Sequence, residues 1–278
     1  MEKQNEVVAR FEYLESQRSN WDSHYQELAD YMLPRKADIV RKRSRGEKRM
    51  ELIFDGTALQ AVDLLASSLH GMLTSGATPW FHLTLKDDQL GRDEEVQAWL
   101  EDTSSRMMRA ITMSNFETEV HEMYVDLVVF GTGCMFVEMD NTSLRFSTRH
   151  ISEFYVAEDQ YGIVDTVFRK YRLPARQAVQ RFGLENVGKF IQKTFEKKPD
   201  EEVAILHSVM PRKERDPTKR DNKNMPFASV YICMETKMVI QESGFQEFPY
   251  VVPRFLKATG EVMGRSPAMV ALPDVKML

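Results

Sequence analysis

The feature that most constrains this fold is a change in the spacing of apolar residues near Gly133. Before this point, apolar residues recur every three or four positions, which is the spacing of one face of a helix. After it, short apolar runs alternate with polar residues and are separated by turn residues, which is typical of strands. The sequence therefore predicts an α+β chain, with a helical N-terminal half packed on a mostly antiparallel mixed sheet.

The first expected helix can be capped by Ser19 or Asn20 and ends at Pro34. Its apolar face consists of Trp21, Tyr25, Leu28 and Met32. A second helix is expected over residues 58–75. Its apolar stripe consists of Val62, Leu65, Leu69 and Leu73.

A third helix is expected over residues 93–112 and a fourth from Asn115 to Gly131. The residues of the third helix that should face inward are Val96, Leu100, Met107 and Ile111. Strands should follow, interrupted by a short helical stretch over residues 174–195. The expected strands are 134–139, 144–148, 154–157, 163–171, 203–209, 227–234 and 238–242.

A further helix should begin near the C-terminus, with Ser266 as its cap and Pro267 in its first turn, before Pro273 interrupts it. These patterns divide the chain into three parts. Residues 1–133 are mainly helical, residues 134–262 are rich in strands with a short helical insert, and residues 263–278 begin a new segment.

Composition places the chain among ordinary globular proteins, with 42% hydrophobic and 28% charged residues and a net charge of −5. No apolar run approaches the roughly 18 residues that a membrane helix needs. Residues 1–17 contain no apolar signal-peptide core, so we expect synthesis in the cytoplasm and no membrane partner. The two cysteines, Cys134 and Cys233, are expected to be free and buried.

The motifs of common enzyme classes are missing. The sequence has no phosphate-binding loop and no Gly-x-Ser-x-Gly nucleophile motif. Gly131-Thr132-Gly133 follows a helix and precedes a strand, so it is better interpreted as a helix stop than as a dinucleotide site. No two of the six histidines have metal-ligand spacing. We therefore predict no catalytic, cofactor-binding or metal residues, no cofactor, and no enzymatic activity.

Two basic loops stand out from this background. The first, residues 35–49, has eight basic and two acidic residues, a formal charge of +6, and the second spans residues 211–225. Such loops attract phosphates without reading sequence, although a solvated loop is the simpler interpretation. The candidate residues for contact with DNA or a partner are Arg41, Lys42, Arg43, Arg45, Lys48, Arg49, Arg212, Lys213, Arg215, Lys219 and Arg220.

Four stretches, taken in order, resemble the head-to-tail connecting (portal) proteins of short-tailed bacteriophages. They begin with WDSHYQELADYMLPRK at Trp21 and continue with FDGTA followed by LLASSLHGMLTSGATPWFHL. The third comprises VFGTGCMFVE and LRFSTRHISEFYVAEDQYGIVDTVFRKYRLPARQAVQRFG, and the last is ESGFQEFPYVVPRFLKATGEVMGRSPAMVALPDVKML. The resemblance covers nearly the whole chain.

The resemblance implies a structural subunit of a ring, usually of about twelve copies, at one vertex of the virion capsid. Double-stranded DNA would enter and leave through this ring. Its other implied partners are the terminase motor, tail and adaptor proteins, and capsid and scaffold proteins, with assembly in the host cytoplasm. Because family members are longer, the chain should be the N-terminal part of the subunit. Residues 1–262 would then be its wing-like body, and residues 263–278 the truncated start of a stem-directed segment.

Two alternatives compete with this interpretation. The basic loops could instead define a sequence-independent nucleic-acid-binding module. An enzyme of DNA packaging, such as the motor ATPase or a nuclease, is a weaker alternative because the phosphate-binding loop is missing.

Overall fold

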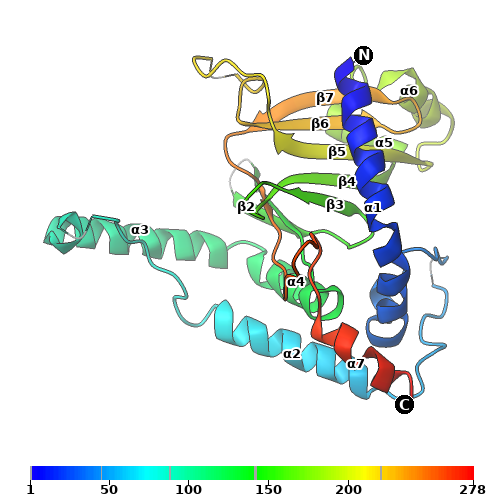
Figure 1. The fold of residues 1–278 in the computed structure, drawn as a ribbon. Coiled ribbons are helices and arrows are strands. Elements are labelled where there is room, and N and C mark those ends of the chain that lie inside the picture. The colour runs from blue at the N-terminus through cyan, green and yellow to red at the C-terminus, as the bar shows by residue number, and fades with distance from the viewer. Residues whose placement is uncertain (1, 45, 88, 141–142, 220) are drawn as a thin grey trace.

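The computed structural model describes residues 2–278 except for 45, 88, 141–142 and 220 (Figure 1). Within this range the strands form two antiparallel sheets, in the orders β2-β1-β8 and β3-β4-β5-β6-β7. The strands are β1 (Met135–Asp140), β2 (Ser143–Thr148), β3 (Phe154–Glu158), β4 (Val164–Pro174), β5 (Glu202–Pro211), β6 (Phe227–Cys233), β7 (Met238–Phe245) and β8 (Tyr250–Val251). The predicted α+β class is confirmed, and of these strands the two-residue β8 was not predicted.

The helices lie mostly in the first half of the chain, as expected. They are α1 (Glu2–Met32), α2 (Thr57–Leu73), α3 (Glu94–Thr112), α4 (Phe116–Phe130), α5 (Ala175–Phe182), α6 (Gly188–Lys197) and α7 (Pro267–Val275), with 3-10 turns at Pro34–Lys36 and Leu90–Arg92. The predicted helical stretch after β4 is divided into α5 and α6, because Gly183 ends α5 with φ 82°.

Helix α1 begins much earlier than the predicted cap at Ser19 or Asn20. Ser19 lies inside the helix, where its hydroxyl donates to the Ser16 carbonyl. The expectation was wrong because the charged start of the chain also carries a short apolar stripe. Val7, Val8 and Phe11 of this stripe are buried against the five-stranded sheet, and this packing stabilises the early turns.

The five-stranded sheet is covered on both faces, and alternate residues of its strands face opposite sides. On β5, Leu206 packs with α1, whereas its neighbour Ile205 packs with α5 and α6. Both side chains are fully buried. Figure 1 shows α1 crossing this sheet and continuing downward to α7.

Helix α4 is the central buried helix, and its end is fixed by a close backbone crossing. Gly131 ends α4 in the left-handed conformation, with φ 76°, which confirms it as a helix stop. A Cβ at this position would lie 2.7 Å from the Arg265 carbonyl carbon, so a side chain does not fit. The Phe255 N–H donates to the Gly131 carbonyl (2.9 Å), and the Gly264 N–H donates to Thr132 Oγ1 (2.8 Å).

The C-terminal helix α7 starts as predicted. Ser266 caps it by accepting from the Met269 N–H (3.1 Å), and the Ser266 hydroxyl also donates to the Val129 carbonyl of α4 (2.8 Å). The predicted interruption at Pro273 is wrong, since α7 continues through it to Val275. A proline so near the helix end removes few backbone bonds, and burial of Leu272 offsets them.

The division of the chain at residues 133 and 262 stays a prediction. The main hydrophobic core takes side chains from both sides of residue 133, including Tyr25 and Phe130 before it and Phe136 after it. Among the described residues, no helix combines the length and the apolar character that a membrane span requires.

Candidate subunit interface and basic loops

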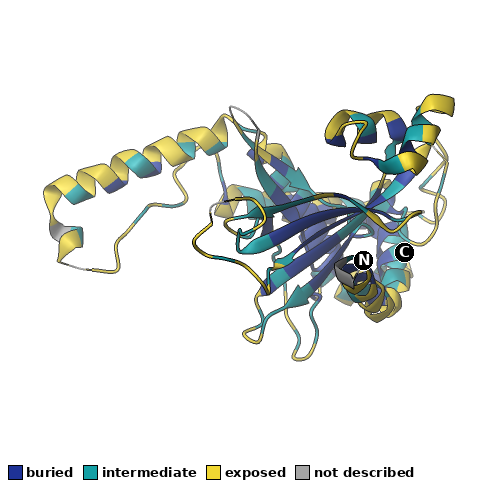
Figure 2. Cartoon of the chain, turned by 90° about the horizontal axis from the view of Figure 1, so that it is seen from above, coloured by how far each residue is buried: buried dark blue, intermediate teal, exposed yellow. Residues whose placement is uncertain are grey.

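A projecting arm, defined here as residues 79–113, stands away from the body of the molecule (Figure 1). Helix α3 forms its axis, and the segment before α3 runs alongside the helix. Figure 2 shows that most of α3 is exposed to solvent. The buried residues of α3 are Leu100 and Ser104. The expectation that Met107 faces inward was wrong, because it is 43% exposed.

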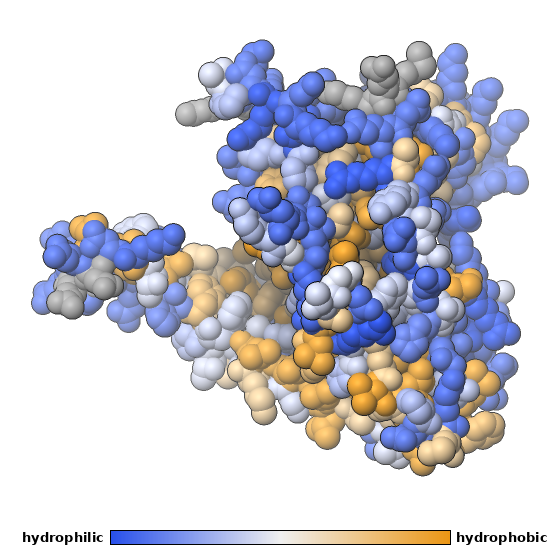
Figure 3. All heavy atoms as spheres, in the orientation of Figure 1, coloured by the Kyte–Doolittle hydropathy of each residue, from blue (hydrophilic) through white to orange (hydrophobic). Residues whose placement is uncertain are grey.

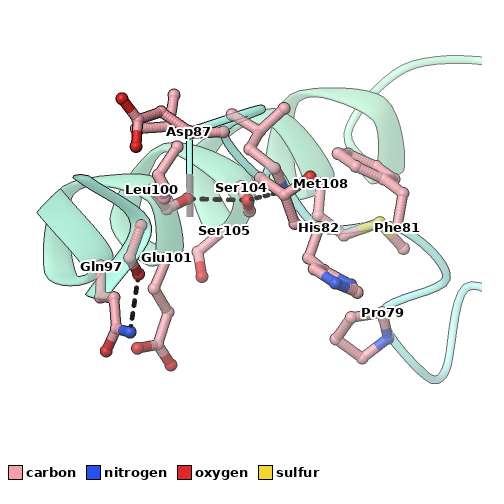
Figure 4. A pocket seen from close by; sticks show the side chains of 14 residues that line it. Pro79, Phe81, His82, Asp87, Gln97, Leu100, Glu101, Ser104, Ser105 and Met108 are labelled. Carbon is pink, nitrogen blue, oxygen red and sulfur yellow. Dashed lines mark hydrogen bonds between the residues drawn. The ribbon is translucent and has the colours of Figure 1, made fainter. Parts of the chain in front are cut away.

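The arm is held together by hydrogen bonds of its own. The Leu83 N–H donates to Ser104 Oγ (2.9 Å), and the Ser104 hydroxyl donates to the Leu100 carbonyl (2.7 Å). Gln97 Nε2 donates to the Gly91 carbonyl (2.9 Å). A groove of about 860 Å³ remains between the segment and the helix (Figure 4). These bonds fix the shape of the arm without tying it to the body.

The tip of the arm is acidic. Its carboxylates lie in the turn before α3 and in the first turns of the helix, and they are Asp87, Asp93, Glu94, Glu95, Glu101 and Asp102. They outnumber the exposed bases beside them, Lys86 and Arg106, and Arg106 pairs with Asp102 (2.8 Å). Asp93 caps α3 by accepting from the Glu95 N–H (2.9 Å), and acidic residues at a helix N-terminus are favourable. The arm thus carries a local negative charge that its own fold stabilises.

Large apolar side chains are also exposed on the arm. They are Trp80, Leu85, Leu90, Trp99, Met107 and Met113. Trp99 is 62% exposed. The neighbouring helix α2 adds exposed Leu65 and Leu73, so the predicted stripe of α2 is buried only in part, at Val62, with Leu69 half-buried. Where such side chains form a contiguous patch, they are typical of protein contacts.

Some basic side chains of the first loop are held in ion pairs, and others are exposed to solvent. Arg43 is nearly buried and pairs with Asp30 (2.9 Å), and Arg49 pairs with Asp38 (2.5 Å). Arg41, Lys42 and Lys48 are exposed. Arg45 lies outside the described residues.

The base of this loop is anchored to α1 and α4. Gln26 Oε1 of α1 accepts from the backbone N–H groups of residues 39–41. Lys36 donates to Asp126 Oδ1 (2.6 Å), and burial raises the pKa of Asp126 even though Lys36 opposes this shift. Burial works against ionisation of Glu122 as well, but Arg35 and Lys36 hold its pKa below the usual value. Arg35 and Lys36 are therefore structural parts of the body.

Exposed apolar residues surround the free cations of this loop. We define the loop face as the exposed residues Val40, Arg41, Lys42, Lys48, Met50, Leu52 and Phe54. Phe54 is 91% exposed, although an aromatic ring of this size favours burial. Glu47 and Glu51 are exposed in the same stretch, so the exposed side chains described in residues 40–54 carry three positive and two negative charges beside their apolar area.

The second basic loop lies at the far end of the molecule. Arg212 is nearly buried and pairs with Glu242 (2.8 Å), whereas Lys213 pairs with Glu6 and Lys219 with Asp216 at exposed positions. Arg215 is exposed. Arg220 falls outside the described part of the chain.

The structure does not bring the two basic loops together. In Figure 1 the second loop is at the top, beside β5 and β6, whereas the first runs down the right-hand flank from the end of α1 to the start of α2. Figure 3 shows hydrophilic residues at the top of this face and more apolar residues toward α2 and α7. A single basic surface for nucleic acid is therefore not supported.

Buried titratable groups in the body belong to the core. The ring of His207 stacks on Tyr231 at 4.0 Å, and its Nε2 lies 3.0 Å from Ser229 Oγ. Burial, together with Arg181, Arg169 and Arg149, holds the pKa of His207 well below its usual value. Burial also favours the neutral form of the two thiols, and it therefore raises the pKa of Cys134 and of Cys233.

Both cysteines are free and buried, as expected. Within the described residues, no three His, Cys, Asp or Glu side chains are grouped to hold a metal ion. The distinctive parts of the molecule are therefore the arm and the loop face. The exposure of the arm could not be predicted from its sequence, because an exposed amphipathic helix has the same periodicity as a buried one.

The chain thus combines a two-sheet body with a largely exposed arm and an exposed loop face. The chain matches the family of bacteriophage head to tail connecting proteins over residues 4–278, and it belongs to that family. It is 35% identical over 98% of its length to a probable portal protein of Bordetella phage BPP-1. It is 34% identical over the same share to a portal protein of Salmonella phage epsilon15. The chain spans about half the length of these curated relatives.

Proposed function

We propose that this chain is the N-terminal part of a structural portal subunit that assembles with copies of itself into a ring at one vertex of the capsid. The observation that carries the proposal is the family match over residues 4–278, together with the two portal relatives. In this proposal residues 1–262 form the wing-like body, and residues 263–278 begin a segment directed toward the stem. A ring of about twelve copies requires head-to-tail interfaces whose rotation closes.

The ring would pass double-stranded DNA during packaging and ejection. Its partners would be the terminase motor, the tail and adaptor proteins, and the capsid and scaffold proteins. Contact with the passing DNA would be electrostatic and independent of sequence, since every base pair must move through. The subunit would have no reaction of its own, would assemble in the host cytoplasm and would remain in the virion.

The test is the mass of the purified protein, measured by multi-angle light scattering between low and high micromolar concentration, with negative-stain images of the same sample. A closed ring of about a dozen copies is the expected result. A chain that stays monomeric at every concentration contradicts the proposal. An ATP hydrolysis assay checks the proposal that the subunit has no reaction of its own, because a structural subunit should show no ATP turnover.

A further inference from the structure

We propose that the arm of one copy docks on the loop face of the next copy, and that this contact joins neighbouring subunits. The inference rests on the proposed ring and assigns the two surfaces that build it. Both surfaces are largely exposed. Trp80, at the start of the arm, stacks on Phe116 of α4 (ring centroids 5.8 Å), whereas Trp99 farther along the arm makes no ring contact with a described residue.

The positions of the two surfaces fit a head-to-tail contact. In Figure 1 the arm extends to the left, and the loop that connects α1 to α2 runs down the opposite flank. A closed ring with a heterologous interface needs two different patches on each subunit, facing opposite neighbours. An arm on one flank and its receiving surface on the other meet this requirement.

The arm exposes more acidic than basic side chains, whereas the loop stretch exposes more basic than acidic ones. The first turns of α3 present Glu94 and Glu95 to solvent, whereas the loop face presents Arg41, Lys42 and Lys48. Among the described residues, no ion pair engages any of these five side chains. Complementary patches of this kind favour the correct orientation and repel wrong ones.

Apolar area accompanies the charges on both sides. Trp99 and Leu90 are exposed on the arm, and Leu52 and Phe54 are exposed on the loop face. Aromatic residues are enriched at the centres of protein interfaces, where surrounding contacts exclude water, and charged residues lie mostly at the rim. Contact between the two surfaces would bury apolar groups that each copy leaves in water.

Two edge strands of the sheets are less available for association. On β2, Asn115 bonds both backbone groups of Phe146, and the Glu119 carboxylate accepts from the Thr148 N–H. At the edge of β3, Arg18 donates to the Phe154 carbonyl. Side chains of the same chain thus cap these edges, which is a common protection against strand pairing. The arm has no comparable cover.

Charge reversal tests the contact directly. One variant carries Glu94→Lys and Glu95→Lys, and a second carries Arg41→Glu and Lys42→Glu. Each variant alone places like charges against each other at every contact, so its association should weaken at least about tenfold. An equal mixture restores opposite charges at every contact if the two variants alternate around the ring. The mixture should therefore recover the wild-type mass.

Matched control variants change the net charge by the same amount at positions outside the arm and the loop face. Glu185→Lys with Glu196→Lys matches the arm variant, and Lys189→Glu with Lys193→Glu matches the loop variant. All four positions are exposed on or beside α5 and α6. Both controls should associate like the wild type, and circular dichroism should show the same helix content in every variant.

Three outcomes would overturn the contact. If either reversal variant keeps the wild-type mass, or if both dissociate and their mixture does not reassemble, the arm does not dock on the loop face. If a control weakens association as much as the matched reversal variant, net charge rather than this contact is responsible. These results leave the ring itself intact, whereas a wild-type chain that stays monomeric overturns both the ring and the contact.

Discussion

The arm and the five-stranded body show two different ways in which one chain uses apolar residues. In the body, Ile205 and Leu206 of one strand are both fully buried because helices cover both faces of the sheet. In the arm, α3 has a similar periodicity, yet Leu100 is its one buried apolar residue among those described. An apolar stripe thus predicts where burial is possible. Whether the stripe is buried within one chain depends on whether another element of that chain packs against it.

The largest expected difference concerns two glycines. Gly131→Ala should destabilise the body by about 4 kcal/mol, because the residue is left-handed and its Cβ would press on the backbone at residues 264–265. Gly91→Ala in the arm meets no atom within 4 Å and should change stability by less than about 0.5 kcal/mol. Urea denaturation measures both. Equal effects would contradict the rigid crossing at the end of α4.

A smaller difference is expected for large apolar side chains. Leu206→Ala should lower the free energy of unfolding by about 3 kcal/mol, because it leaves a cavity between the sheet and α1. Trp99→Ala should cost less than about 0.5 kcal/mol in the monomer, since the ring is mostly exposed. Denaturation at low protein concentration, where association is minimal, isolates this comparison. A large loss for Trp99→Ala would mean that the arm packs on its own body.

The smallest expected effect is a pH dependence of the free energy of unfolding that arises from a buried histidine in the body. Because burial holds the pKa of His207 well below 6.5, the unfolded chain binds a proton that the folded chain does not. Below pH 6.5 the free energy of unfolding should therefore fall with decreasing pH, by up to about 1.4 kcal/mol per pH unit from this residue.

The variant His207→Phe should reduce this slope between pH 6.5 and about 5. Stability curves at half-unit pH intervals provide the measurement. An unchanged slope in His207→Phe would assign the acid sensitivity to other groups.

Much of the fold could be predicted from local signals. The stop at Gly131 and the cap at Ser266 follow from backbone chemistry that is written in a few adjacent residues. The true start of α1 could not be predicted in the same way, because Val7 and Phe11 are helical only through contact with a sheet far along the chain.

The candidate surfaces were predicted less well. Clustered charge identified the first basic loop, but it could not show that Arg43 and Arg49 pair with Asp30 and Asp38. The exposure of the arm was not predicted, because periodicity alone does not distinguish an exposed amphipathic helix from a buried one.

The crossing between the end of α4 and the start of α7 has a mechanical consequence. The Gly264 N–H to Thr132 bond and the Ser266 hydroxyl to Val129 bond connect residues more than 130 positions apart in sequence. With no room for a side chain at Gly131, the two segments form a stiff joint. A force applied to α7 is therefore transmitted to the buried helix α4 in the middle of the molecule. The hydrophobic core around α4, which includes residues of both sheets, would bear that force.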